Sequence, residues 1–222
     1  MGWQAFWQAG LGLISCPRCP LCGSDQAPAA LPGQFCQDCR WRLALPLGGL
    51  QGDAPLLWCG LARYGGELRR LVLAQRRRPQ AAVLQALALE LLRCCSTAIE
   101  ASQLVPIPGW KRSGGNPLPL ALATALVARH PGRLTLAAEV LQRRRASVGQ
   151  HHLDRQQRLE NLSGAFVCSC PPCPSQRQSL WLVDDILTTG ATAQAAAAAL
   201  VSAGWQVDGL LCLARTASSA GL

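Results

Sequence analysis

The chain has 222 residues and a formal net charge of +9, and half of its residues are hydrophobic. This length is enough for one sizeable α/β core with a small appendage, and the hydrophobic content excludes an intrinsically disordered chain. No apolar stretch of about 18 or more residues runs without a polar interruption, which argues against a transmembrane helix. Residues 1–15 lack a basic residue before their apolar part and a small-residue cleavage site. We therefore expect no signal peptide and a cytoplasmic location.

Nearly all of the positive charge comes from arginine, because Lys111 is the only lysine. Arginine binds phosphate and carboxylate groups through two parallel N–H donors, whereas lysine acts as a point charge. An acidic or phosphorylated partner, such as nucleic acid, is one interpretation. A GC-biased genome that encodes arginine in place of lysine is the other, and charge alone does not separate them.

The chain divides into three predicted parts. Residues 1–45 hold a short amphipathic helix over 1–15 and a cysteine-rich segment. Residues 46–60 are a connector rich in glycine and proline, and residues 61–222 form the main domain.

The cysteine-rich segment contains two C-x-x-C pairs with thirteen residues between them, in a chain of 12 cysteines. Without a secretion signal, this spacing favours metal binding over disulfides. It is typical of a zinc-ribbon-like module with a tetrahedral, structural zinc ion, which folds a segment too small to fold alone. Cys16 forms an overlapping pair with Cys19, so the membership of the first pair stays open. The predicted ligands are Cys19, Cys22, Cys36 and Cys39.

In the main domain, helical and strand-like patterns alternate. Helices are predicted over 66–77, 80–95, 117–130 and 192–204, and strands over 104–108, 133–142, 164–169, 179–183 and 205–215. Such alternation predicts an α/β fold with a mostly parallel sheet and helices on both faces.

A loop insertion is expected over residues 168–178. Its cysteines are Cys168, Cys170 and Cys173. These thiols would need a fourth ligand to hold a second metal ion, and incidental cysteines are the alternative.

Two adjacent carboxylates follow the apolar run 180–183, where ligands of parallel sheets bind. The next helix is expected to begin near residue 191 or 192, and its free N–H groups form an anion site. A sugar phosphate fits this pattern. Its hydroxyls, or a hydrated Mg²⁺, would meet the acids, and its phosphate would meet the turn. The alternative is an ordinary strand–loop–helix with a capping threonine. The predicted ligand-binding residues are Asp184, Asp185, Thr188, Thr189, Gly190, Ala191 and Thr192.

The stretch LVDDILTTGAT (182–192) resembles the 5-phosphoribosyl-1-pyrophosphate (PRPP) motif of type I phosphoribosyltransferases. This resemblance implies that Asp184 and Asp185 address the ribose hydroxyls and that residues 188–192 surround the 5-phosphate. Mg²⁺ would be bound by the pyrophosphate. Purine-type members usually carry a carboxylate where this chain has Thr188, so base activation by that acid is not expected.

A zinc module ahead of this motif resembles the ComF family. The matching stretches are ARYGGELRRLVLAQRRR (62–78), LVPIPGWKRSGGN (104–116) and RRRASVGQHHLDRQQRLENLSGAF (143–166). The resemblance implies a type I phosphoribosyltransferase-like domain and a pyrophosphate loop with Pro106, Pro108, Lys111 and Arg112. After this loop the family usually continues Arg-Gly-Phe-Asn-Gln, whereas this chain has residues 113–117, SGGNP. That departure leaves transferase turnover open.

The family is tied to natural transformation, which implies a role in DNA uptake, single-stranded DNA and competence or helicase-type proteins as partners. Several arginines are candidates for contacts with the nucleic acid. The alternative for each of them is a position on a solvated face or in a local phosphate site. An active transferase on an unidentified acceptor and a non-enzymatic regulator are the rival functions. The candidate nucleic-acid contacts are Arg143, Arg144, Arg145, Arg155 and Arg158.

Overall fold

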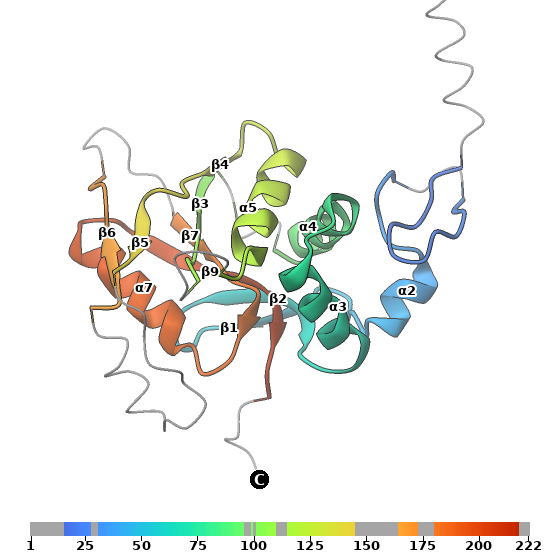
Figure 1. Ribbon diagram of the computed structural model, residues 1–222, viewed down its shortest axis with the longest axis horizontal. Coiled ribbons are helices and arrows are strands. Elements are labelled where there is room, and N and C mark those ends of the chain that lie inside the picture. Colours follow the sequence, from blue (N-terminus) through green and yellow to red (C-terminus); the bar gives the residue numbers. More distant parts are fainter. Residues whose placement is uncertain are drawn as a thin grey trace, which may run out of the picture.

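Helices and strands alternate along the chain in the computed structural model, and most of the strands assemble into one large sheet (Figure 1). The structure describes residues 16–27, 31–95, 99, 101–109, 115–144, 164–172 and 180–217. The helix expected over residues 1–15 lies outside these ranges.

The large sheet has seven strands, and every pair of neighbours is parallel except β1 and β2. The order is β1 (Leu50–Gly52), β2 (Trp58–Arg63), β9 (Val207–Arg215), β7 (Leu180–Val183), β3 (Ser102–Pro106) and β4 (Leu134–Leu136), with β8 (Ile186–Leu187) also paired to β9. All four residues of β7 are buried. A central parallel strand is covered on both faces, which explains its uninterrupted apolar sequence.

Helices cover both faces of the sheet. The long helices are α3 (Gly66–Arg77), α4 (Ala81–Cys95), α5 (Leu118–Arg129) and α7 (Ala191–Ser202). Trp181 and Val183 pack into the core formed with the first three of these helices, whereas Leu180 and Leu182 pack into the core formed with α7. The predicted α/β class with a mostly parallel sheet is therefore confirmed. No helix within the described ranges is both long and apolar enough to cross a bilayer.

The single strand predicted over 133–142 is wrong, because two strands of different sheets occupy this stretch. β4 pairs with β3, whereas β5 (Leu141–Arg143) pairs with β6 (Phe166–Cys168) in a separate two-stranded sheet. The chain turns between them, where the Val140 N–H donates to the Ala137 carbonyl at 3.4 Å. Hydrophobic pattern alone does not show where one partner strand ends and the next begins.

The cysteine module, defined here as residues 16–45, contains the short helix α2 (Gln37–Arg42) and packs directly against α4. Phe35 and Leu43 are buried in the same hydrophobic cluster as α4. Strand β1 and the start of β2 lie within the stretch expected as a connector, so part of 46–60 belongs to the sheet. The domain boundaries at 45 and 60 stay predictions.

Candidate functional site

Asp184 and Asp185 lie at the carboxyl end of β7, beside the end of β3, where Pro106 is the partner of Val183. Their backbone is held by β9. The Asp184 N–H donates to the Leu211 carbonyl at 2.9 Å, and the Asp185 carbonyl accepts from the N–H groups of Leu213 and Ala214 at 3.0 and 3.1 Å. The sheet therefore fixes the position of both acids.

The carboxylate of Asp185 points into the protein and is fully engaged there. Its side chain is 2 % exposed. Arg76, near the end of α3, donates from Nε to Oδ2 at 2.5 Å and from Nη2 to Oδ1 at 2.7 Å. Asn116, just before α5, donates from Nδ2 to Oδ2 at 2.6 Å. The charge-assisted hydrogen bonds to Asp185 are the main reason why the pKa of Arg76 is raised above its usual range.

Asp184 lies in a different environment. Its side chain is partly buried, and its Oδ1 accepts the Asp185 N–H at 2.8 Å. Burial, followed by the neighbouring charge of Asp185, raises the pKa of Asp184 to about 8. The Asp184 carboxyl therefore keeps its proton to a higher pH than an ordinary aspartate does, and in the protonated form it can donate as well as accept a hydrogen bond.

The turn after the acids has the predicted local structure, with α7 beginning at Ala191. Thr188 is exposed, Thr189 and Thr192 are partly buried, and Gly190 and Ala191 are buried. The Thr189 Oγ1 accepts the N–H of Ala191 at 3.4 Å.

Gly190 is needed at this turn for two reasons. Its φ of 83° lies in the left-handed region that favours glycine. A Cβ at this position would also lie 2.2 Å from Cγ of Pro55, in the connection between β1 and β2. Pro55 therefore fills the space next to Gly190, where the sequence predicted room for a phosphate. Of the threonines of the turn, Thr188 is the exposed one.

The segment predicted as a pyrophosphate loop starts and ends beside the acids. Pro106 is buried at the end of β3, Pro108 is partly buried, and the Ile107 N–H donates to the Val183 carbonyl at 2.9 Å. Lys111 and Arg112 lie outside the described residues. At the other end of the segment, Asn116 bonds to Asp185.

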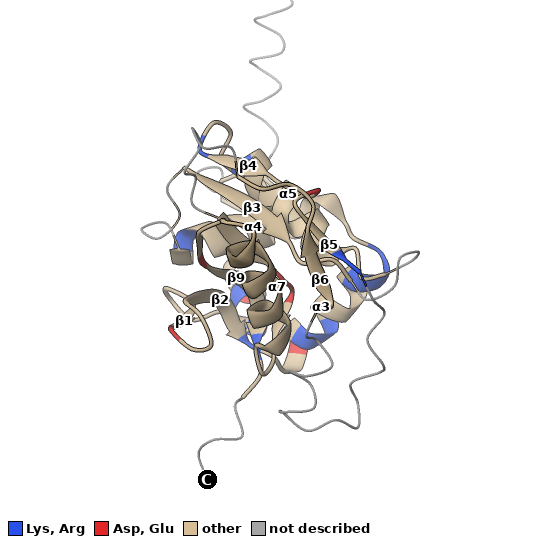
Figure 2. Cartoon of the chain, turned by 90° about the vertical axis from the view of Figure 1, so that its left-hand side faces the viewer, with Lys and Arg blue, Asp and Glu red and all other residues tan. Residues whose placement is uncertain are grey.

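Two of the nucleic-acid candidates are described by the structure, and they differ in environment. Arg144 is exposed, whereas the guanidinium of Arg143 lies 4.9 Å from the centroid of the Phe166 ring. Burial lowers the pKa of Arg143, and the charge of Asp184 opposes this shift. Arg143 is thus close enough to Asp184 for their charges to interact. Figure 2 shows the basic residues of α3 and β5 in blue. The remaining candidates, Arg145, Arg155 and Arg158, lie outside the described residues.

The four predicted zinc ligands come together in the cysteine module. The Sγ atoms of Cys19, Cys22, Cys36 and Cys39 all lie within 4.8 Å of one another. The Sγ atoms of Cys22 and Cys36 are 3.7 Å apart. In a tetrahedral site with Zn–S bonds of ~2.3 Å, two sulfur ligands are about 3.8 Å apart. Backbone N–H groups of Cys36 and Cys39 donate to the sulfurs of Cys19 and Cys36, each at 3.4 Å. The cluster can therefore hold a zinc ion, and Cys16 is not part of it.

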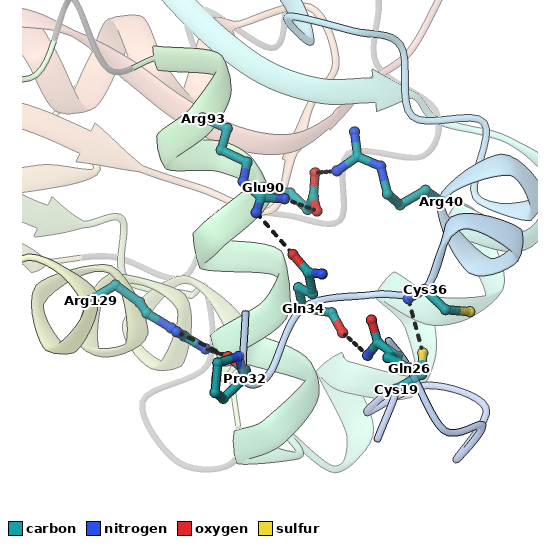
Figure 3. A network of polar contacts seen from close by, with 9 residues as sticks. All are labelled: Cys19, Gln26, Pro32, Gln34, Cys36, Arg40, Glu90, Arg93 and Arg129. Atoms are coloured by element: carbon teal, nitrogen blue, oxygen red, sulfur yellow. Dashed lines mark hydrogen bonds and ion pairs between the residues drawn. The ribbon is translucent and has the colours of Figure 1, made fainter. Parts of the chain in front are cut away.

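A polar network joins the cysteine module to α4 and α5 (Figure 3). Glu90 of α4 is 3 % exposed and binds Arg40 of α2 as well as Arg93 of its own helix. Arg93 also donates to the Gln34 side chain at 3.0 Å. From α5, Arg129 donates to the Pro32 carbonyl at 3.5 Å.

A second metal site was considered for the insertion at residues 168–178. Among the described residues, no cluster of metal ligands is present there. Cys168 donates from Sγ to the Cys170 carbonyl at 3.0 Å. Cys173 lies outside the described ranges, so this site stays a hypothesis.

Sequence reasoning did not anticipate the partners of Asp185. Arg76 lies within the stretch 62–78 that resembles the family, and Asn116 lies within the segment 113–117 that departs from the family pattern, but neither was predicted as a site residue. Their side chains reach Asp185 from 109 and 69 positions away along the chain. A single sequence contains no signal for such a contact.

The comparisons with known proteins found similarity in solved structures only. No family model and no curated protein matches the chain. A phosphoribosyltransferase from Corynebacterium diphtheriae is 17 % identical, with a TM-score of 0.41 over 70 % of this chain and 72 % of that one. Orotate phosphoribosyltransferase from Mycobacterium tuberculosis, solved with Fe(III) dicitrate, is 16 % identical, with a TM-score of 0.39 over 79 % and 81 % of the two chains.

A hypoxanthine phosphoribosyltransferase from Staphylococcus aureus is 12 % identical, with a TM-score of 0.38 over 67 % and 76 % of the two chains. Because these TM-scores lie below 0.5, the likeness does not bear on ligand or activity. What this chain binds must be inferred from its own residues.

Proposed function

We propose that the main domain binds a phosphoribosyl ligand, PRPP or a relative of it, at the carboxyl end of β7. The observation that carries this proposal is the adjacency of two acids fixed by the sheet and a threonine-rich turn that opens α7. Asp184 is partly exposed and Thr188 is exposed. The motif resemblance of residues 182–192 supports the same ligand class.

Each part of the ligand has a matching part of the site. The ribose hydroxyls meet the partly exposed carboxyl of Asp184, which accepts hydrogen bonds and, when protonated, also donates one. The 5-phosphate meets the hydroxyls of Thr188, Thr189 and Thr192 and the N-terminal end of α7, whose free N–H groups and dipole favour an anion. The diphosphate lies towards the segment that begins at Pro106. Mg²⁺ arrives with the diphosphate, which supplies the oxygen ligands it prefers.

The test is a calorimetric titration of the protein with PRPP, with and without Mg²⁺. We expect binding that strengthens with Mg²⁺ and that is lost in the double variant Asp184→Asn plus Asp185→Asn. Asp208→Asn, a change of the same kind on β9, is the matched control and should bind as the wild type does. Equal affinity in the wild type and the double variant would contradict the site.

Phosphoribosyl transfer is a separate proposal, because the acceptor is not identified and the loop after Pro108 departs from the family pattern. Magnesium-dependent release of pyrophosphate from PRPP with one acceptor would support an active transferase. PRPP binding without release of pyrophosphate by any acceptor tried would favour a non-enzymatic regulator that uses the pocket as a sensor.

The wider role follows from the resemblance to the ComF family: we propose a part in DNA uptake, with the cysteine module as a structural zinc site. Single-stranded DNA would bind through arginines such as the exposed Arg144. Affinity for an oligonucleotide should then fall steeply as salt rises, since each phosphate contact releases a counterion. A flat salt profile would argue against DNA binding.

A further inference from the structure

Arg76 uses only one edge of its guanidinium to bind Asp185. Nε and Nη2 donate to the two carboxylate oxygens. A guanidinium has five N–H donors in a fixed plane, so the edge formed by Nη1 and the second N–H of Nη2 is left over. Within the described part of the chain, Nη1 makes no hydrogen bond. The side chain of Arg76 is 35 % exposed, against 2 % for Asp185. Arg76 is therefore the more accessible member of the pair.

Asn116 contacts the same acid as Arg76. Its amide donates to the same Asp185 oxygen that Nε of Arg76 reaches, Oδ2. Asn116 closes the segment that leaves β3 at Pro106, and the turn 188–192 makes no hydrogen bond to this oxygen among the described residues. Arg76 therefore lies close to Asn116, the end of the segment expected to receive the diphosphate.

We propose that Arg76 is an anion-binding residue of the phosphoribosyl site, that its free edge receives the diphosphate, and that Asp185 is its positioning residue. This inference rests on the proposed function and deepens it. It changes the predicted role of Asp185, whose carboxylate orients the arginine and does not bind the ribose. Asp184 is then the acid that faces the sugar.

The physical reason is preorganisation. The bidentate contact fixes the plane of the guanidinium before the ligand arrives, so little rotamer entropy is lost when the second edge binds phosphate oxygens. Removal of Arg76 from the carboxylate would leave a buried charge without its main partner, which is costly. The ion pair between Arg76 and Asp185 is therefore suited to stay intact while the other edge of the guanidinium binds phosphate oxygens.

The experiment compares Arg76→Gln with Arg77→Gln by calorimetry. The two variants remove the same charge from adjacent positions of α3, but Arg77 is exposed, and in the described part of the chain no hydrogen bond or ion pair joins it to Asp184 or Asp185. The ligands are Mg²⁺-PRPP, Mg²⁺-pyrophosphate and ribose 5-phosphate. In Arg76→Gln we expect affinity for the two diphosphates to fall about tenfold to a hundredfold, as for loss of hydrogen bonds to a charged group. Ribose 5-phosphate should bind as before, and Arg77→Gln should resemble the wild type throughout.

Asp185→Asn separates a positioning role from a ribose contact. A positioning residue predicts weaker binding of both diphosphates with unchanged affinity for ribose 5-phosphate. A ribose contact predicts loss of ribose 5-phosphate as well, which would overturn the inference. Arg76→Lys keeps the charge without the fork and should bind the diphosphates more weakly than the wild type.

Circular dichroism and thermal unfolding check that each variant is folded. Equal loss in Arg76→Gln and Arg77→Gln, or no loss in either, would overturn the inference and leave the proposed function standing. A wild type that binds none of the three ligands would overturn both.

Discussion

Asp184 has a carboxyl group whose titration couples pH to stability. Its pKa of about 8 lies above the usual aspartate value of 3.8, because burial and the charge of Asp185 both penalise the carboxylate. Arg76 and the N–H of Asp185 act in the opposite direction, as does the charge attraction shared with Arg143. Between these two pH values the folded chain keeps a proton that the unfolded chain releases. The free energy of unfolding should therefore fall as pH rises through this window.

Asp184→Asn tests this coupling, because asparagine is a permanently neutral mimic of the protonated acid. We expect the variant to lack this fall and to be more stable than the wild type at pH 8 by at least about 1 kcal/mol. Urea unfolding at several pH values between 5 and 8 measures the difference. Asp208→Asn serves as the control, and parallel stability curves for wild type and Asp184→Asn would show that Asp184 is not the group responsible.

The site was predictable at the level of residues only where the chemistry is local. The acids and the turn that follows are contiguous in sequence, so their meaning could be inferred from a strand pattern and a helix start. The different environments of the Asp184 and Asp185 side chains were not predictable. They depend on Arg76 and Asn116, which other elements bring to one acid and not to the other.

At the scale of elements, the long periodic segments were the reliable ones. Helices expected over 66–77 and 80–95 are observed at Gly66–Arg77 and Ala81–Cys95. Strand β2 was missed, because it follows a glycine- and proline-rich stretch that favours a loop. Its place in the sheet is decided by parallel pairing with β9, which lies about 150 positions further along the chain.

Strand β9 contains a glycine, Gly209, at a position where a larger residue would clash with its neighbours. Gly209 is the partner of Trp181 on β7, and a Cβ at this position would lie 2.5 Å from Cζ3 of the indole. The Leu57 carbonyl would lie at 2.8 Å on another side. We expect Gly209→Ala to lower the free energy of unfolding by about 1–3 kcal/mol, as overpacking of a core does.

The rescue variant is Gly209→Ala combined with Trp181→Phe, in which the smaller ring leaves room for the new methyl group. The combined loss of stability should be less than the sum of the two single losses, as measured by denaturant unfolding. Additive losses would show that the indole does not set the requirement for glycine.

At the scale of the whole molecule, the cysteine module and the main domain share one core. Cys19, Phe35 and Cys39 belong to the same buried cluster as α4 and α5. Loss of a metal ion from the four cysteines should therefore lower the stability of the whole chain, and not of the module alone. Zinc content by mass spectrometry and thermal unfolding with and without a chelator measure this. An unchanged main transition after complete zinc removal would contradict the coupling.

Glu90 is the polar centre of this shared interface. It is 3 % exposed and binds one arginine of the module and one of its own helix. Glu90→Gln removes the negative charge and leaves Arg40 and Arg93 as neighbouring cations without their partner. We expect a loss of about 3 kcal/mol in the free energy of unfolding, as for other broken buried ion pairs.

Glu67→Gln is the matched control, since Glu67 pairs with Arg70 at the surface, where such a pair contributes about 0–1 kcal/mol. Urea unfolding measures both variants. Equal small losses would show that the module is held to α4 by apolar packing alone, and a large loss confined to Glu90→Gln would identify this ion-pair network as the second component of the interface.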